Sequence, residues 1–329
     1  MRLPRLLPLL LALFACAALA FAVPGAARAE GLAFVMNSGA ASISVIDMST
    51  HKELRRIPVL REPHHWALSP DGHSLIIGDS SGNTLFFLDP TTGAVQRRVL
   101  VADPYQLGFS PNGKYFVVNG LARNQIDVYA ADSMKLLHRF PIRAMPSHLA
   151  YSPGSHRVFV TLQETNRMVA IDLSTMRVLW DRPVGNTPAG VLWQNGKLLV
   201  CDMGTDYVAE VDPADGRVIG HIVTDRGAHN LFRSPDGKTI WVNNRVSGTT
   251  TVLDAGSLRP LHTYHIPGGP DDLFFAPDGK VWITRRFAES VAVLDPATGH
   301  FTTIDVGRSP HGIFLNPRAP SPDRLASAR

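Results

Sequence analysis

Histidines recur at one position in the sequence, and imidazole is a side chain that does chemistry near neutral pH. His64 and His65 follow a proline at the start of an apolar run, in the stretch PHHWAL. His148, His229 and His311 precede later apolar runs in the same way. A neutral imidazole binds a divalent metal ion or accepts a proton as a general base. These five of the 13 histidines are the first candidates for a functional site.

An internal repeat sets the spacing of these histidines. A turn signal of the type Ser-Pro-Asp-Gly recurs at intervals of 41, 42, 41, 41, 42 and 40 residues. A second marker, a β-rich tripeptide that mostly ends in aspartate, keeps the same period. Two markers with one period indicate a repeat protein. The turns begin at Ser69, Ser110, Ser152, Trp193, Ser234, Ala276 and Asn316.

Each repeat unit predicts four short antiparallel strands. In the first complete unit the expected strands are 66–68, 75–78, 85–88 and 95–101, separated by turns rich in Pro, Asp, Gly, Ser and Thr. No segment shows a sustained helical period. Four strands in about 40–45 residues are the signature of a β-propeller blade.

The two ends of the repeat region are predicted to share one blade. Residues 33–37, 42–47 and 54–59 match the second, third and fourth strands of a blade, and residues 312–316 match a first strand. With the six complete units this predicts an all-β, seven-bladed β-propeller over residues 30–317, closed by a split blade. Closure removes the free sheet edges that invite aggregation.

The propeller topology predicts that the histidines meet at one mouth of the central channel. The first strand of a blade is innermost, so the connections between blades surround the channel, where ligand sites of this architecture are expected. Alignment of the repeats gives two positions after the proline position of each unit, which holds a proline in five of the seven units. The first holds His64, Tyr105, Ser147, Pro188, His229, Asp271 and His311, and the second holds His65, Gln106, His148, Ala189, Asn230, Asp272 and Gly312.

Loops after the second strands are expected at the same mouth. They add amide, carboxylate and guanidinium groups, which suit a small polar or anionic ligand or a metal ion. For the metal, the candidate ligands are His64, His148, His229 and His311. The loop residues are Asn37, Asp79, Asn119, Arg123, Gln163, Cys201, Asp202, Asn243, Asn244, Arg245, Arg285 and Arg286.

A plainer interpretation stands beside this one. Loop residues are polar because they are solvated, and the histidines could only bridge neighbouring blades. Cys201 is expected to be a small buried apolar side chain. Trp66, Trp193, Trp241 and Trp282 lie in predicted strands and are expected to pack between blades.

The amino terminus predicts export. Arg2 and Arg5 precede an apolar run over 6–23, and Ala27-Arg28-Ala29 is a cleavage signal, so residues 1–29 are expected to be a signal peptide removed before Glu30. The protein is then periplasmic or secreted, with no membrane span left after cleavage. Residues 318–329 are expected to be a disordered tail.

Charge and cysteine content exclude two further classes. The net charge of +4 includes the arginines of the leader, so the mature chain has 29 basic and 28 acidic residues and no basic surface for nucleic acid. Cys201 is the one cysteine after cleavage, so no intramolecular disulfide forms. We expect a monomer.

The motifs SPDGK, WVNN and VLDPATG resemble those of the YVTN family of bacterial and archaeal β-propellers over residues 31–317. Related by that resemblance are surface-layer proteins and the haem-carrying propellers of cytochrome cd-type nitrite reductases. The nitrite-reductase resemblance implies eight blades, whereas the repeats here give seven. No Cys-x-x-Cys-His is present, so any haem would be non-covalent, with His148, His229 and His311 as possible axial ligands.

Three functions follow from the residues and the resemblance. The first is an exported, non-catalytic binding or scaffold protein that presents its channel mouth to a small polar molecule, a metal or a periplasmic protein. The second is a lyase or lactonase, because DGKVWIT and SPHGI are similar to the propeller of streptogramin lyases, which implies His311 as general base near His229, Asp271 and Asp272. The third is a carrier of non-covalent haem or another redox cofactor.

Overall fold

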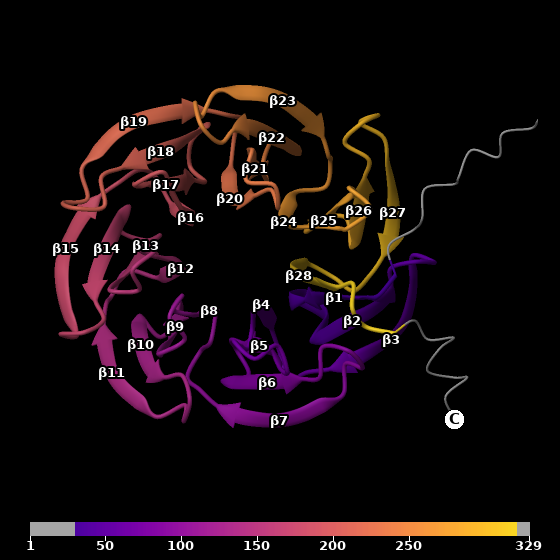
Figure 1. The fold of residues 1–329 in the computed structure, drawn as a ribbon, viewed down its shortest axis with the longest axis horizontal. Coiled ribbons are helices and arrows are strands. Elements are labelled where there is room, and N and C mark those ends of the chain that lie inside the picture. The colour runs from indigo at the N-terminus through magenta and orange to yellow at the C-terminus, as the bar shows by residue number, and fades with distance from the viewer. Residues whose placement is uncertain (1–29, 321–329) are drawn as a thin grey trace, which may run out of the picture.

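Seven antiparallel four-stranded sheets surround a central channel (Figure 1). The computed structural model describes residues 30–320; the predicted signal peptide and residues 321–329 lie outside this range. Within it the only helical element is a short 3₁₀ turn, η1 (Ser38–Ala40). The predicted all-β, seven-bladed propeller is therefore confirmed. No helix in the described part of the chain is long and apolar enough to cross a membrane.

Six blades consist of consecutive strands, and in each the first strand is innermost. Blade 1 contains β4 (Pro63–Leu68), β5 (Leu75–Asp79), β6 (Thr84–Leu88) and β7 (Val95–Leu100). Blade 2 contains β8 (Gln106–Phe109), β9 (Tyr115–Gly120), β10 (Gln125–Ala130) and β11 (Leu136–Pro141). Blade 3 contains β12 (Pro146–Tyr151), β13 (Arg157–Leu162), β14 (Arg167–Asp172) and β15 (Arg177–Pro183).

The second half of the ring has the same order of strands. Blade 4 contains β16 (Pro188–Gln194), β17 (Lys197–Asp202), β18 (Tyr207–Val211) and β19 (Val218–Val223). Blade 5 contains β20 (Ala228–Arg233), β21 (Thr239–Asn244), β22 (Thr249–Asp254) and β23 (Pro260–His265). Blade 6 contains β24 (Pro270–Phe275), β25 (Val281–Arg285), β26 (Ser290–Leu294) and β27 (Phe301–Asp305).

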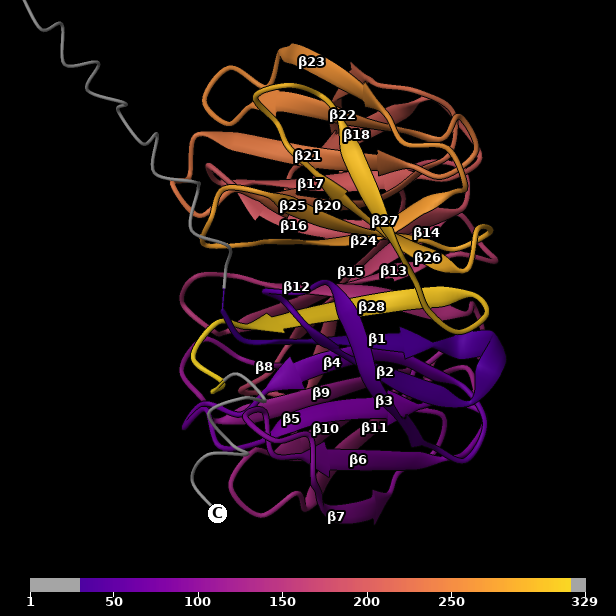
Figure 2. The same cartoon turned by 90° about the vertical axis from the view of Figure 1, so that its right-hand side faces the viewer.

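Blade 7 joins the two ends of the described chain. It consists of β28 (Pro310–Asn316), β1 (Leu32–Asn37), β2 (Ser42–Asp47) and β3 (Lys52–Pro58), in that order from the channel outward. β28 pairs with β1 in antiparallel register, with Phe314 opposite Phe34, and Figure 2 shows the two strands side by side. The expected split blade is therefore present.

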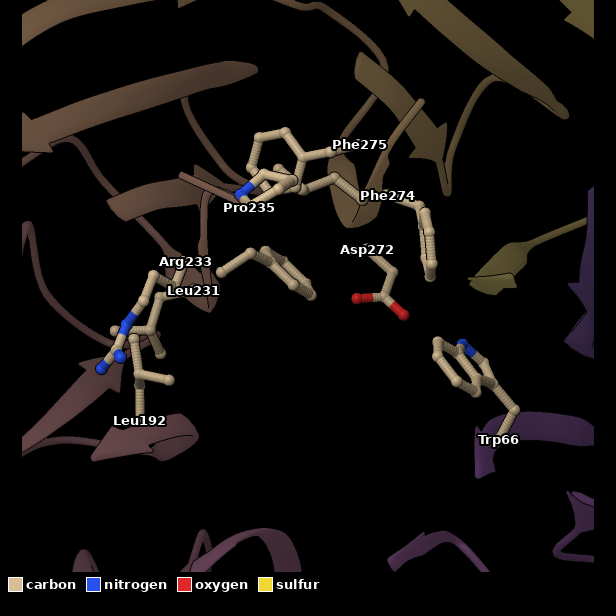
Figure 3. Close-up of a pocket in the computed structure, with 10 residues that line it drawn as sticks. Trp66, Leu192, Leu231, Arg233, Pro235, Asp272, Phe274 and Phe275 are labelled. Carbon is tan, nitrogen blue, oxygen red and sulfur yellow. The ribbon is translucent and has the colours of Figure 1, made fainter. Parts of the chain in front are cut away.

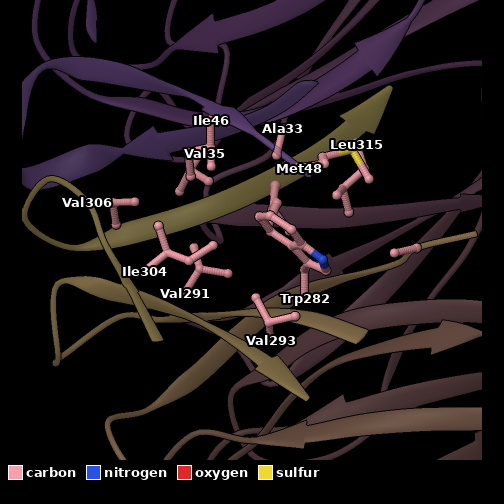
Figure 4. Close-up of a cluster of buried hydrophobic side chains, with 12 residues drawn as sticks. Ala33, Val35, Ile46, Met48, Trp282, Val291, Val293, Ile304, Val306 and Leu315 are labelled. Atoms are coloured by element: carbon pink, nitrogen blue, oxygen red, sulfur yellow. The ribbon is translucent and has the colours of Figure 1, made fainter. Parts of the chain in front are cut away.

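Apolar side chains between neighbouring blades form the core. Trp282 on β25 is 1% exposed and packs between blades 6 and 7, against residues such as Ala33 and Met48 (Figure 4). Ala319, which the sequence assigns to the tail, is also buried and packs in the cluster that contains Phe34 and Phe314. The packed ring thus extends past Pro317.

Side chains at the ends of the second strands hold the connections between blades. The carboxylate of Asp79 accepts hydrogen bonds from the backbone N–H groups of Leu60, Arg61, Glu62 and Gly82, at 2.7–2.9 Å. The amide of Asn37, at the same position in blade 7, accepts one from Gly307 at 3.0 Å. This position therefore fixes the loop that leads to the channel mouth.

Replacing Asp79 by alanine should cost about 3 kcal/mol, because four backbone donors lose a charged acceptor. For a protein of this size that corresponds to a melting temperature about 5 °C lower. Thermal unfolding of Asp79→Ala beside Asp132→Ala, which truncates an exposed aspartate, measures the effect. Equal melting temperatures of the two variants would show that the loop does not depend on this carboxylate.

Candidate functional site

A β-bulge in the innermost strands turns the histidines toward the channel. The register of the first strand shifts between Pro63 and Trp66, and corresponding shifts occur in blades 3 to 7. A bulge bends the strand and changes the direction of its side chains. His64 and His65 lie within the bulge of β4, which explains why two adjacent residues of one strand both reach the cluster described below.

Blade 4 departs from the alignment by one residue. Pro188 pairs with Asp202 as Pro63 pairs with Asp79, so the two positions after the proline hold Ala189 and Gly190, not Pro188 and Ala189. The cause is a shorter hairpin, in which Gln194 pairs with Lys197 across a two-residue turn. The turn marker therefore lies one residue off the common position in this unit.

Four imidazole rings form a closed circuit across the channel. The ring centres are 5.0 Å apart for His65 and His148, 5.4 Å for His148 and His229, 5.9 Å for His229 and His311, and 4.4 Å for His311 and His65. Each ring is nearly perpendicular to the next, with interplanar angles of 80–83°. We call these four residues the imidazole circuit. It combines side chains from blades 1, 3, 5 and 7.

The imidazole circuit is buried, and half of its eight ring nitrogens have no hydrogen-bond partner within the described residues. The four side chains are 1–4% exposed. Nε2 of His65, Nε2 of His148 and both ring nitrogens of His311 are unpartnered within the described protein. Buried polar atoms are nearly always paired, so several unpaired nitrogens in one place call for a partner such as an ion or water.

Asp271 supplies the negative charge beside the circuit. Its carboxylate is fully buried and lies 2.8 Å from Nδ1 of His229 and 3.9 Å from Nε2 of His311. The guanidinium of Arg245 donates to the same carboxylate and lies 2.6 Å from Nε2 of His229. Arg286 donates to the second carboxylate oxygen at 3.2 Å. One atom each of His229, Asp271 and His311 lie within 4.8 Å of one another, which is a possible metal-binding set.

His64 and Tyr105 pack on the rim of the circuit. The ring of His64 is 4.7 Å from that of His311 and 4.6 Å from that of Tyr105. Nε2 of His64 is 2.9 Å from the carboxylate of Glu62, and this hydrogen bond lowers the pKa of Glu62 to about 2. The carboxylate of Glu62 thus holds His64 outside the circuit. Of the two adjacent histidines, only His65 belongs to the imidazole circuit.

Burial keeps the histidines neutral. It lowers the pKa of His65, His148 and His311 well below 6.5, and neighbouring imidazoles add to the effect for His65 and His148. Burial alone would raise the pKa of Asp271, but the charge of Arg245 and the hydrogen bond from His229 outweigh it and hold that pKa well below its usual value. The site therefore combines neutral imidazoles with one ionised carboxylate, the forms that bind a metal ion.

Several other residues that were expected to line the mouth instead form hydrogen bonds with loops and strands of the propeller. Asp79 holds a loop, and the amide of Asn119 donates to the backbone carbonyl of Ser147 in the next blade at 2.7 Å. Asn244 donates to two threonines of its own blade. Arg285 donates to the carbonyl of Pro267 at 2.7 Å, so of the three arginines only Arg245 and Arg286 reach Asp271.

Two buried carboxyl groups lie away from the circuit. Asp202 is fully buried without a hydrogen-bond partner within the described residues, and burial raises its pKa to about 8. Asp272 accepts a hydrogen bond from Asn230 at 3.3 Å and lines a cavity deeper in the channel. Burial, with the charge of Asp271, raises the pKa of Asp272 well above its usual value. Of the adjacent pair, only Asp271 contacts the imidazoles.

Two contributors to the site were missed in the sequence. Glu62 stands before the proline of its unit, and only its position two residues from His64 could have pointed to it. Ser147 stands at the first aligned position of its unit, where nothing in the sequence indicates its contact with His148. Its hydroxyl lies 2.7 Å from Nδ1 of His148 and accepts a hydrogen bond from Gln163 at 2.6 Å. These two hydrogen bonds fix the orientation of the His148 ring, so that its unpartnered Nε2 lies on the side away from Ser147.

The model of one protein family matches residues 5–321, nearly the whole sequence; its description is YNCE-like beta-propeller. The chain belongs to this family. The resemblance to seven-bladed YVTN-type propellers is thereby confirmed at the level of family and fold. A comparison with curated protein sequences gives no match.

Solved structures with the same fold include enzymes and a haem-related protein. The periplasmic gluconolactonase PpgL of Pseudomonas aeruginosa has a TM-score of 0.68 and 16% identity, over 86% of this chain and 99% of that one. Dihydro-heme d1 dehydrogenase NirN, solved in complex with DHE, has a TM-score of 0.65 and 15% identity, over 88% of this chain and 76% of that one. A streptogramin B lyase has a TM-score of 0.65 and 13% identity, over 77% of this chain and 93% of that one. At these identities the likeness establishes the fold alone.

The imidazole circuit does not fit a haem. Its neighbouring ring centres lie 4.4–5.9 Å apart, so no flat gap for a macrocycle separates them. A single ion needs far less room. Imidazoles bound to one ion through nitrogen at about 2.1 Å have neighbouring ring centres about 4.5–5.2 Å apart, close to the observed spacing.

Acid should destabilise the metal-free protein through these histidines. Their pKa values are below 6.5 in the folded state, so the unfolded chain binds more protons as the pH falls below 6.5, and stability falls with it. Asp202 and Asp272 act in the opposite direction, because their folded-state pKa values are raised. The loss of melting temperature between pH 7 and pH 5 should therefore be smaller for His148→Gln than for the native chain. An equal loss in both would contradict a neutral, buried His148.

Proposed function

We propose that the protein is an exported β-propeller that binds one divalent transition-metal ion at the imidazole circuit. His65, His148 and His311 would hold the ion through their free Nε2 atoms, and His229 would join them only where Arg245 releases its Nε2. Asp271 would orient His229 and balance charge. Histidine nitrogen is a common ligand of zinc, copper, nickel and iron. In this proposal His65 takes the place of His64 among the metal ligands suggested by the sequence.

The observation that carries the proposal is the set of unpaired nitrogens on the buried circuit. Three of its four rings offer an Nε2 atom without a partner, and the fourth, His229, is held between Asp271 and Arg245. Neutral imidazoles bind metal without first losing a proton. The charges nearby balance: Asp271 and Glu62 offset Arg245 and Arg286.

Export and access complete the proposal. The signal sequence at residues 1–29 would deliver the protein to the periplasm or outside the cell. Arg245 and Arg286 are each about one-fifth exposed at the mouth, where a small polar molecule or a periplasmic protein would approach the bound ion. In this view the ion and the two guanidinium groups together recognise an anionic partner.

Thermal unfolding of chelator-treated protein tests the proposal. Zinc at about 1,000 times its dissociation constant should stabilise the folded chain by about 4 kcal/mol. For a protein of this length that corresponds to a melting temperature about 6 °C higher. Magnesium, which prefers oxygen ligands, should leave it unchanged. His65→Gln should remove most of the zinc effect, whereas His300→Gln, at an exposed histidine, should keep it. An equal response of both variants would contradict the proposal.

A second candidate is a ring-opening lyase or lactonase with His311 as general base. It is favoured by one observation: both ring nitrogens of His311 are unpartnered, and burial keeps the ring neutral and able to accept a proton. The two functions assign different roles to His311. Lactone hydrolysis or depsipeptide cleavage that His311→Gln abolishes, and that a chelator does not affect, would support the enzyme and oppose the metal site.

A further inference from the structure

A cavity lies in the channel beyond the imidazole circuit. It has a volume of about 390 Å³ and extends across the channel, between side chains of β4, β16, β20 and β24. This volume lies within the range of about 300–1,000 Å³ that small-molecule sites occupy. Its lining is largely apolar and aromatic. The wall comprises Trp66, Leu192, Leu231, Phe232, Arg233, Pro235, Asp272, Leu273, Phe274 and Phe275.

The cavity faces the end of the channel opposite the histidines. Each innermost strand runs from the mouth with the imidazoles toward the turn of the type Ser-Pro-Asp-Gly. Trp66 follows His64 and His65 on β4, and Pro235 belongs to the turn that follows β20. A ligand in the cavity would therefore enter from the turn face, without passing the imidazole circuit.

One side of the cavity is a fixed aromatic wall. The ring centre of Trp66 is 5.9 Å from that of Phe274 and 4.8 Å from that of Phe314. Figure 3 shows Trp66 and Phe274 on one side of the carboxyl group of Asp272, and Leu231 and Leu192 on the other. A flat ring inserted between these walls would contact aromatic faces and aliphatic side chains at once, which favours an aromatic ligand.

The polar groups of the cavity are separated along the channel. Asp272 is 5% exposed at the inner end, and its neighbour in sequence, Asp271, carries the negative charge of the circuit. Arg233 lies at the outer end, exposed, with its guanidinium held by the carbonyl of Trp193 at 2.8 Å. A negative group on a ligand is disfavoured near the charge of Asp271 and favoured near Arg233.

We propose that this cavity binds a flat aromatic small molecule, with its apolar rings against Trp66 and Phe274 and an anionic group at Arg233. The site is independent of the metal proposal, because none of its contacts involves the imidazole circuit. Aromatic carboxylates and sulfonates have the required chemistry: rings to fill the apolar space and one anionic group at the edge.

Fluorescence titration of chelator-treated protein with anilinonaphthalene sulfonate tests this proposal. The dye has aromatic rings and one anionic group. Leu192→Trp, which fills the cavity, should weaken its binding at least tenfold. Trp66→Leu, which removes the flat wall but keeps an apolar side chain, should weaken it about fivefold and serves if Leu192→Trp fails to fold.

A comparison of two dyes tests the role of the Arg233 charge at the outer end of the cavity. Arg233→Gln should weaken binding of the sulfonate about fivefold and leave phenylnaphthylamine, which has the same rings without the sulfonate, unchanged. Phe287→Ser, which removes an exposed aromatic side chain elsewhere, is the matched control for dye on the surface and should bind like the native chain. Native affinity in folded Leu192→Trp or Trp66→Leu, or loss of binding in Phe287→Ser, would overturn the proposal.

Discussion

A chain that ends at Arg308 is expected to unfold at a temperature about 10 °C or more below that of the full-length protein. The deletion removes β28, the inner strand of blade 7. Ile313, Phe314 and Leu315 on this strand are at most 6% exposed, and burial of each side chain contributes about 1.5–3 kcal/mol. A loss of about 6 kcal/mol corresponds to a decrease of this size in a protein of this length.

Loss of β28 also leaves β1 without its inner neighbour. Six residues of β1 are fully buried or nearly so, and their backbone groups would face a free sheet edge. Such edges pair with other chains, so the truncated protein should aggregate at concentrations at which the native protein stays monodisperse. A chain that ends at Pro320 is the control, because it keeps β28 and the buried Ala319. If the chain ending at Arg308 melts with the control, blade 7 does not close the ring.

The double substitution His148→Gln with His311→Gln should weaken zinc binding at least 1,000-fold. Loss of an outer partner of a metal ligand already costs about 10–100-fold in affinity, so loss of two direct ligands costs more. Glutamine preserves polarity and approximate size, and the two residues come from β12 and β28 on opposite sides of the circuit. Removing both interrupts the circuit twice.

Calorimetric titration at pH 7.5 measures this effect. The matched control is His73→Gln with His300→Gln, which removes two exposed histidines and should leave zinc affinity unchanged. Circular dichroism establishes that both proteins are folded. Native affinity in the His148 and His311 double variant would exclude these rings as ligands.

The fold could be predicted from the sequence because every blade repeats one local pattern. Residues such as Pro70-Asp71-Gly72 favour a tight turn because of their backbone geometry, and a turn signal of this type recurs with the period of the repeat. The missing first strand before residue 33 and the surplus strand at 312–316 are also visible in the sequence, so closure by β28 followed from the repeat itself. Blade 4 was aligned one residue off because its hairpin is shorter.

The candidate site was less predictable because it depends on side-chain directions across blades. The repeat identified the five histidines, but the bulge in the inner strand decides which of two adjacent residues joins the circuit, as with His64 and His65 on β4. The polar residues at the ends of the second strands cannot be assigned different roles from the sequence alone. Asp79 binds backbone N–H groups, whereas Arg245, one residue past the corresponding position, reaches Asp271. Hydrogen bonds between distant loops separate these roles.

Metal analysis of the protein isolated without an affinity tag from its native cells tests the central claim most directly. The account predicts about one transition-metal ion per chain, no haem absorption, and an almost metal-free double variant with glutamine at His148 and His311, isolated in the same way. Native protein without a stoichiometric metal, or equal metal content in the folded double variant, would contradict it.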